Sequence, residues 1–186
     1  MADSDSKLDR IALIAELIGR APTSLGRTAL MKCLFFLKVL RNVPLPYNFR
    51  LYTYGPFDSD VLDDLRYAES LGAVESRLVS FPGGRAYEYQ RGPKAKELER
   101  QAGEFPARHK ESINWVLNEF GNRTAVDLEV ASTLVYVDRA LAEKNVRTTI
   151  AELARKVHDV KPHLALDAIE REACALKERN FLTAVT

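Results

Sequence analysis

The residues of this chain that could support acid–base or metal chemistry are few. The three histidines are His109, His158 and His163. His158 and His163 flank Pro162 and could form a metal-binding or acid–base pair, but such a site needs convergent ligands or a nucleophile beside a base. We therefore expect surface residues in a turn. Because G-x-S-x-G, H-E-x-x-H and P-loop spacings are absent from the sequence, we predict no catalytic residue, no cofactor and no metal.

A run of carboxylates follows the dipeptide Gly55-Pro56. Its members are Asp58, Asp60, Asp63, Asp64 and Glu69. Asp60 and Asp64 are one helical turn apart and share a face, so a cation could bind there. No EF-hand loop follows, and a helix cap at Asp58 with a solvated acidic face is the interpretation that we favour.

Aromatic residues surround the same dipeptide: Tyr47, Phe49, Tyr52, Tyr54 and Phe57. Exposed aromatic side chains supply much of the binding energy of protein interfaces, although the same residues could equally fill a core. A buried tyrosine hydroxyl needs a hydrogen-bond partner, so we expect one or two of these tyrosines to stay near the surface. The predicted partner-binding residues are Tyr52, Tyr54, Phe57, Asp60, Asp63 and Asp64.

The elements that position these residues follow from apolar spacing and from helix breakers. The first half predicts helices at residues 6–19, 26–42 and 58–72, a short strand at 49–54 and a β-hairpin at 76–90. Asp58 is the expected N-cap of the third helix, and Pro82-Gly83-Gly84 is the expected hairpin turn. Three helices, a strand and a hairpin in this order indicate a winged helix.

The second half is predicted to be helical. Thr124 with Asp127, and Thr149 with Glu152, have the spacing of capping boxes, and Lys161-Pro162 interrupts the last helices. The fold class is therefore mainly α with a small β wing. We expect a winged-helix-like lobe at residues 1–92 packed against a helical lobe at residues 93–186.

Basic residues in or beside the predicted hairpin could contact nucleic acid. They are Arg77, Arg85, Arg91 and Lys94. In a winged helix the third helix commonly enters the major groove, where basic and amide side chains meet bases and phosphates. Here that helix carries mainly carboxylates, and Arg66 is its one basic residue. Carboxylates near phosphates oppose binding, so a protein partner fits this surface better.

Composition supports a folded protein without a strong charge. The 186 residues are 46% apolar, enough for a packed core, and 27 basic residues nearly balance 26 acidic ones, whereas nucleic-acid-binding proteins are usually more basic. The acidic N-terminus lacks an apolar signal core and no apolar run has the length of a membrane span, so we expect a cytoplasmic protein. Cys33 and Cys174 lie in apolar helical patterns and are expected to be small buried thiols.

Three segments resemble a known family. Residues 28–37, TALMKCLFFL, resemble the KLQKLLYL-type helix of the YwgA-like family, which also occurs in Panacea-domain proteins such as the SocA-type antitoxins. Residues 52–60 resemble their YGPYS turn, and residues 131–134 and 160–162 resemble the C-terminal half of the YwgA-like pattern. Arg27-Thr28 and Met31 stand where the pattern more often has Lys and Gln. The resemblance implies a helical, winged-helix-like body with a regulatory or partner-binding role, in some members as an antitoxin or protease adaptor.

The sequence thus favours a non-enzymatic regulatory protein that binds a protein partner, antitoxin- or adaptor-like. The alternative is a winged-helix DNA-binding transcriptional regulator, which would act as a dimer, and an enzyme is third. A homodimer is compatible with either of the first two interpretations.

Overall fold

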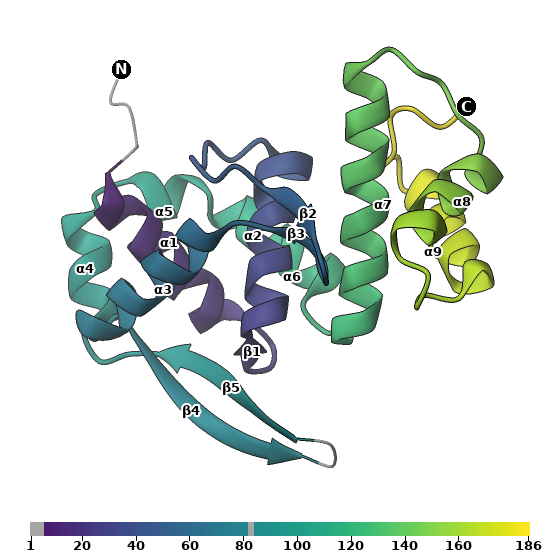
Figure 1. The fold of residues 1–186 in the computed structure, drawn as a ribbon. Helices are drawn as coiled ribbons and strands as arrows, with labels where there is room; N and C mark the ends of the chain where they lie inside the picture. Colours follow the sequence, from purple (N-terminus) through teal and green to yellow (C-terminus); the bar gives the residue numbers. More distant parts are fainter. Residues whose placement is uncertain (1–5, 82–83) are drawn as a thin grey trace. The chain divides into compact units, whose positions relative to one another are not determined.

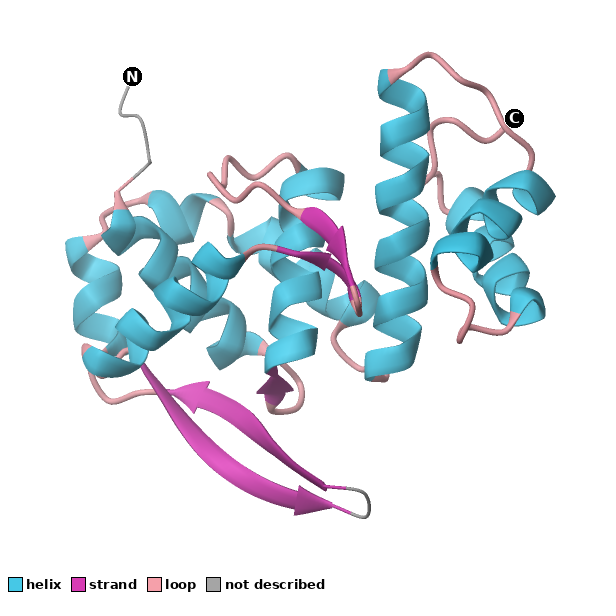
Figure 2. Ribbon diagram, viewed as in Figure 1, coloured by secondary structure: helices cyan, strands magenta, loops and turns pink. Residues whose placement is uncertain are grey.

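The computed structural model describes residues 6–81 and 84–186, which are mainly helical (Figure 1 and Figure 2). Within those ranges the helices are α1 (Lys7–Arg20), α2 (Arg27–Arg41), α3 (Ser59–Ser70), α4 (Ala95–Gln101), α5 (Phe105–Arg108), α6 (Lys110–Phe120), α7 (Ala125–Glu143), α8 (Ile150–Val160) and α9 (Leu166–Glu178). The strands are β1 (Leu25–Gly26), β2 (Arg50–Tyr52), β3 (Gly55–Phe57), β4 (Val74–Phe81) and β5 (Gly84–Arg91). The predicted class, mainly α with a small β wing, is confirmed. None of the described helices combines the length and apolar character of a membrane span.

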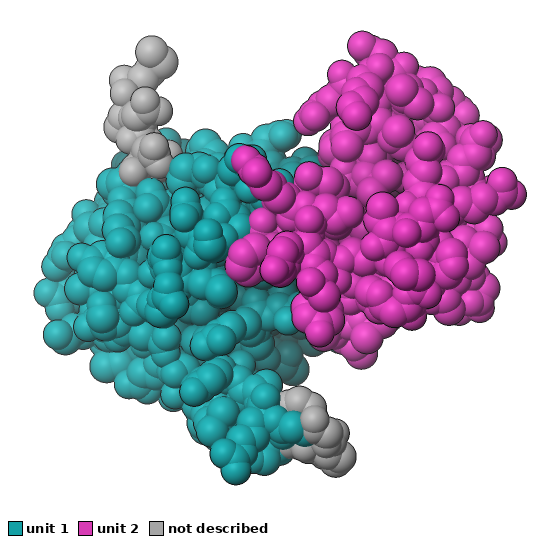
Figure 3. Space-filling view, in the orientation of Figure 1, with its two compact units in different colours: residues 1–49, 58–123 teal, residues 50–57, 124–186 magenta. Residues whose placement is uncertain are grey.

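Contacts divide the chain into two compact units, which Figure 3 colours separately. In the described ranges, unit 1 comprises residues 6–49, 58–81 and 84–123, and unit 2 comprises residues 50–57 and 124–186. This division differs from the predicted boundary between residues 92 and 93. Helices α4, α5 and α6 belong to unit 1 because they pack on α1, and α6 also packs on α2. The β2–β3 hairpin belongs to unit 2 because it packs on α7.

Helices α1 and α2 form the core of unit 1, and their bounds agree with the predicted ranges. The Ser6 side chain caps α1 by accepting a hydrogen bond from the Asp9 amide at 3.1 Å. Asn42, with a φ of 53°, ends α2 in the left-handed conformation that asparagine tolerates. The rings of Phe36 and Phe120 stack with centroids 3.9 Å apart and thereby join α2 to α6.

The sheet of unit 1 has the antiparallel strand order β1-β5-β4. The predicted hairpin is confirmed by the pairing of β4 with β5, which Figure 1 shows extending away from the helices of unit 1. Pro82 and Gly83 of its predicted turn lie outside the described residues. Strand β1 was not predicted from the sequence, and its two residues pair with Tyr89 and Glu88. A strand between the first two helices and a two-stranded wing after the third complete a winged-helix-like arrangement.

Unit 2 packs α8 and α9 against α7 and against each other. Both predicted capping boxes are present, at the starts of α7 and α8, and α8 ends before Lys161 as expected. The chain after α9 is bound to α7 through Asp138, whose buried carboxylate accepts hydrogen bonds from the amides of Thr183 and Ala184, both at 2.8 Å. These amides satisfy a carboxylate that would otherwise be costly to bury.

Two expectations about local structure were wrong. The segment 49–54 is not one strand, because the chain reverses after Tyr52 and returns as β3 before α3 begins. Cys174 is exposed, whereas Cys33 is buried as expected. On α9 the buried side chains include Ala173, and the next residue is rotated by about 100° away from that face.

The predicted cap of α3 is confirmed, since the Asp58 carboxylate accepts a hydrogen bond from the Asp60 amide at 2.9 Å.

Candidate functional site

The most exposed aromatic side chains of residues 6–80 and 84–186 lie at the tip of the β2–β3 hairpin. Tyr52 pairs with Gly55 across the hairpin, so Thr53 and Tyr54 form the turn. Gly55 has a φ of 88°, a conformation that glycine adopts without strain. Tyr52 is 68% exposed and Tyr54 is 66% exposed, and the Tyr52 ring lies 5.7 Å from the half-buried ring of Phe57. The turn therefore presents two tyrosines to solvent.

A buried lysine binds the backbone of this turn. Lys161 is 4% exposed, and its Nζ donates hydrogen bonds to the carbonyl oxygens of Tyr52 and Thr53. Its Nζ also lies 3.8 Å from Oε1 of Glu129 on α7. Burial lowers the pKa of Lys161, and the Glu129 carboxylate opposes this change by favouring the charged ammonium.

Glu129 connects Lys161 to one of the histidines. Glu129 is 5% exposed, and its Oε1 is hydrogen-bonded to Nε2 of His163 at 3.0 Å. We call Lys161, Glu129 and His163 the Lys161 network. His158 is instead hydrogen-bonded through Nδ1 to the carbonyl oxygen of Leu164, at 2.9 Å. The two histidines therefore have different hydrogen-bond partners. Across residues 6–81 and 84–186 there is no cluster of three or more histidine, cysteine, aspartate or glutamate side chains that could hold a metal ion.

The third histidine, His109, lies in unit 1. Its ring is half-buried and 4.6 Å from the ring of Phe105. Burial lowers the pKa of His109, and the neighbouring positive charge of Arg108 lowers it further.

The predicted acidic face of α3 is present in part. Asp60 and Asp63 are exposed, and Asp63 is paired with Arg66 on the same helix. These residues belong to unit 1, whereas Tyr52, Tyr54 and Phe57 belong to unit 2. The predicted partner-binding set is therefore divided between the two units.

Asp64 is buried, and the expectation that it contributes to the exposed acidic face was wrong. It is 3% exposed, and its Oδ2 accepts hydrogen bonds from Arg10 Nε at 2.6 Å and from the Tyr47 hydroxyl at 3.0 Å. Burial raises the pKa of Tyr47, and the adjacent negative charge of Asp64 raises it further. Asp64 thus holds α1 and the segment before β2 against α3, while Tyr47 is one of the predicted aromatic residues that fill the core.

Three of the four predicted nucleic-acid contacts are exposed. Arg77, Arg85 and Lys94 all lie on the surface of unit 1, and Arg77 Nη2 is 3.5 Å from Glu88 Oε2 across the wing. An exposed ion pair of this kind contributes little to stability, so Arg77 stays accessible to another partner.

Two carboxylates of unit 1 bind the guanidinium of Arg91, the fourth predicted nucleic-acid contact. Arg91 is paired with Glu99 through Nη2, and its Nη1 lies 3.8 Å from Glu16 Oε2. Burial raises the pKa of Glu99, the positive charge of Arg91 opposes this change and Glu16 adds to it. Arg91 therefore joins α1 to α4 through Glu16 and Glu99.

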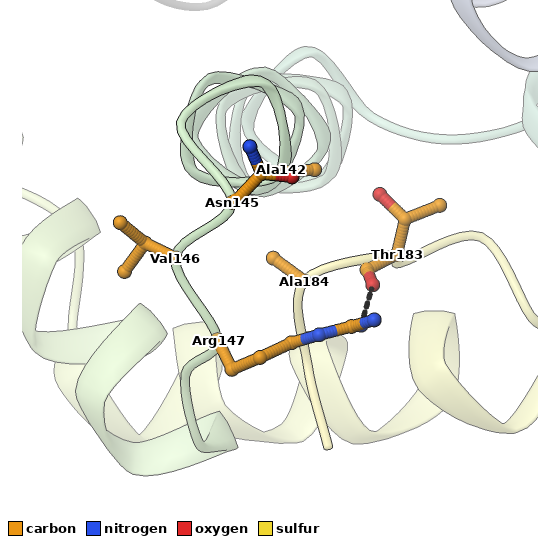
Figure 4. A pocket seen from close by; sticks show the side chains of 6 residues that line it. All are labelled: Ala142, Asn145, Val146, Arg147, Thr183 and Ala184. Atoms are coloured by element: carbon orange, nitrogen blue, oxygen red, sulfur yellow. Dashed lines mark hydrogen bonds between the residues drawn. The ribbon is translucent and has the colours of Figure 1, made fainter.

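A cavity of about 270 Å³ lies in unit 2 beside the chain that follows α9 (Figure 4). Its lining consists of Ala142, Asn145, Val146, Arg147, Thr183 and Ala184. Arg147 is the one charged residue of the lining, and its Nη1 donates a hydrogen bond to the carbonyl oxygen of Thr183 at 2.8 Å. The lining residues contain no carboxylate, histidine or cysteine, so they offer neither an acid–base pair nor an activated nucleophile.

Sequence reasoning missed the Lys161 network. Lys161 was interpreted as part of a helix interruption with Pro162 and of the family-like segment 160–162, and not as a buried partner of the turn. Glu129 lies between Leu128 and Val130. A single carboxylate at the apolar positions of a helix is a signal for a buried pair, because such groups are rarely buried without a partner.

Comparison with models of known protein families finds none that matches this chain, and comparison with curated proteins finds no match either.

Proposed function

We propose that this chain is a non-enzymatic regulatory protein, antitoxin- or adaptor-like, that binds a protein partner through the β2–β3 hairpin tip. The observation that carries the proposal is the exposure of about two-thirds of Tyr52 and Tyr54 on a turn whose backbone is bound by a buried lysine. Tyrosine offers a large contact area with few rotatable bonds, and a turn that is already ordered loses little conformational freedom on binding.

Apolar residues next to Lys161 in the sequence are exposed as well. Val160 is 52% exposed and Pro162 is also exposed. The sequence resemblance to YwgA-like and Panacea-domain proteins supports the same role. Both cysteines are free thiols, which fits the cytoplasmic location that belongs to this proposal.

The second candidate is a DNA-binding transcriptional regulator, which the winged-helix-like arrangement of unit 1 favours. Exposed Arg77, Arg85 and Lys94 would be its phosphate contacts. Exposed Asp60 and Asp63 on α3 oppose it, because carboxylates repel phosphates on the helix that would enter the groove. We therefore rank it below protein binding.

The experiment compares binding by the full chain and by two variants. A Tyr52→Ser/Tyr54→Ser double variant should lose a stoichiometric partner recovered from host extract, and with the purified partner its affinity should fall by about ten-fold or more. Tyr67→Ser is the matched control, because Tyr67 is also an exposed tyrosine, 41% accessible, but lies on α3 in unit 1. Retention of the partner by the double variant would contradict the proposal. Submicromolar duplex binding that Arg85→Ala abolishes would promote the DNA-binding regulator instead.

A further inference from the structure

The wing of unit 1 has two faces of different chemistry. Alternate residues of a strand point to opposite faces of a sheet. On one face, Val74 and its partner Arg91 form one end, where Glu16 and Glu99 bind Arg91. We call the rest of this face the Leu78 face, and it is made by Ser76, Leu78 and Ser80 of β4 with their cross-strand partners Tyr89, Tyr87 and Arg85 of β5. The other face is made by Glu75, Arg77 and Val79 with their partners Gln90, Glu88 and Ala86.

Charges on the second face are paired within the wing. Arg77 Nη2 lies 3.5 Å from Glu88 Oε2, and Gln90 Nε2 donates a hydrogen bond to Glu75 Oε2 at 3.1 Å. This face therefore carries both signs of charge side by side on the two strands.

The Leu78 face carries only positive charge. Arg85 is exposed, and none of the six strand residues of this face is acidic. Arg27 of α2 adds a second cation, because its Nε donates a hydrogen bond to the Tyr89 hydroxyl at 3.0 Å and its Cζ lies 5.0 Å from the centroid of the Tyr87 ring. The tyrosines thus hold this guanidinium on the β5 side of the face, where it adds positive charge.

The centre of the Leu78 face is apolar and exposed. Leu78 is 49% exposed and Tyr87 is 42% exposed, and the two residues are directly opposite each other in the β4–β5 register. Cross-strand neighbours at this position have their Cβ atoms about 5 Å apart, so the two side chains form one apolar surface.

Strand β4 is also an edge strand. It is eight residues long, and in the described part of the sheet β5 is its neighbour on one side while its other side has no strand. Alternate residues of such an edge direct backbone N–H and C=O groups outward, where an extended peptide can pair with them.

We propose that β4 and the Leu78 face form a second docking surface, which binds an extended acidic polypeptide segment as an added strand. Backbone hydrogen bonds to β4 supply affinity, an apolar side chain of the segment covers Leu78, and its carboxylates meet Arg85. Arg27, on the β5 side of the face, adds to its positive potential. This surface belongs to unit 1, whereas Tyr52 and Tyr54 belong to unit 2. Nucleic acid fits it less well, because a phosphodiester cannot pair with a strand edge and an exposed leucine offers no contact to a phosphate.

The test uses the full chain and a fluorescein-labelled seven-residue peptide, Ser-Glu-Ser-Val-Ser-Glu-Ser, whose two glutamates and one valine share one face of a strand. Its binding is followed by fluorescence anisotropy. We expect saturable binding that weakens as salt is added. Methylation of alternate backbone nitrogens of the peptide should weaken binding by about ten-fold or more, since it removes the strand hydrogen bonds. Arg85→Glu should weaken binding by a similar factor and reduce its salt dependence.

The matched control is Arg77→Glu. It makes the same change in net charge on the same wing, but on the opposite face, so it should change affinity by less than about two-fold. Tyr52→Ser/Tyr54→Ser should likewise leave peptide binding unchanged, which separates this proposal from the proposed function. Circular dichroism of each variant establishes that the fold is retained.

Several results would overturn the proposal. One is the absence of saturable binding up to about 1 mM peptide, because a dissociation constant of that size corresponds to a binding free energy of only about −4 kcal/mol. Another is an equal loss in Arg77→Glu and Arg85→Glu, which would indicate a general charge effect. Tighter binding of a single-stranded or duplex oligonucleotide than of the peptide would assign the face to nucleic acid. A dimer in sedimentation analysis that Leu78→Asp dissociates would assign the edge to a second copy of this chain.

Discussion

Replacing Lys161 with methionine tests whether the Lys161 network holds the hairpin tip in place. Methionine keeps an unbranched side chain of similar length but removes the ammonium that binds the carbonyl oxygens of Tyr52 and Thr53. It also leaves Glu129, which is buried, with His163 as its hydrogen-bond partner in the network. The substitution should therefore destabilise unit 2 and loosen the turn.

The size of the effect follows from these contacts. Removing one member of a buried ion pair costs about 3–5 kcal/mol, because the remaining charge stays buried. Two features reduce this free-energy cost. His163 retains its hydrogen bond to Glu129, and the carbonyl oxygens of an exposed turn can accept hydrogen bonds from water in place of Lys161. We expect Lys161→Met to lower the free energy of unfolding of unit 2 by about 2–4 kcal/mol. Adding Glu129→Gln should restore part of the loss, because it removes the unpaired charge.

The assay is urea unfolding followed by circular dichroism, together with hydrogen exchange of the amides in residues 50–57. Lys156→Met is the matched control, because Lys156 is exposed on α8 and should change the free energy of unfolding by less than about 0.5 kcal/mol. If Lys161→Met behaves like Lys156→Met and exchange in the hairpin is unchanged, the network does not stabilise the tip. The rigidity argument for partner binding would then fail.

Further predictions concern the two thiols and the cap of α8. Ellman's reagent should modify Cys174 in the native chain and Cys33 only after unfolding, because burial raises the pKa of Cys33 to about 12 and leaves little thiolate near pH 8; rapid reaction of both thiols in the native chain would contradict this. Hydrogen bonds from Thr149 hold the pKa of Glu152 below its ordinary value of 4.5, so this carboxylate contributes stability above that value and the contribution is lost as the pH falls through the folded-state pKa. The melting temperature of Glu152→Gln should accordingly fall less than that of the original chain between about pH 5 and pH 3, and equal losses would count against the capping box as its source.

Features that depend on neighbouring residues were predictable from the sequence. The cap at Asp58 and the capping box at Thr149 depend on groups two or three residues away, and both are present. The helix ranges and the wing follow from apolar spacing and turn residues in the same way. One or two of Tyr47, Tyr52 and Tyr54 were expected near the surface, because a tyrosine hydroxyl is costly to bury without a partner, and Tyr52 and Tyr54 are exposed.

Features that depend on distant residues were not predictable. The sequence placed Asp64 on an acidic face because it lies one helical turn from Asp60, whereas its partner in the structure, Arg10, lies 54 residues earlier. The same helical spacing that puts Asp60 and Asp64 one turn apart cannot tell which of the two points inward. Lys161 likewise binds a carbonyl 109 residues away, so its role depends on tertiary structure. The turn before β3 was missed because a two-residue reversal leaves little trace in the sequence. Its local signal is a glycine, Gly55, which has a positive φ in the structure.

Unit 2 combines two segments that are far apart in the sequence, residues 50–57 and 124–186, and this affects how the chain folds during synthesis. The hairpin of residues 50–57 leaves the ribosome well before α7 and α8, and Lys161 is polymerised 109 residues after Tyr52. At about 5–20 residues per second, the tyrosines wait about 5–20 s for the lysine that binds their turn. During that interval the nascent chain exposes an aromatic segment without its final support, so a chaperone or the partner itself can meet it first. Truncation at residue 124 would make this state permanent, and a fragment of residues 124–186 would carry Lys161 without the carbonyl oxygens that it binds.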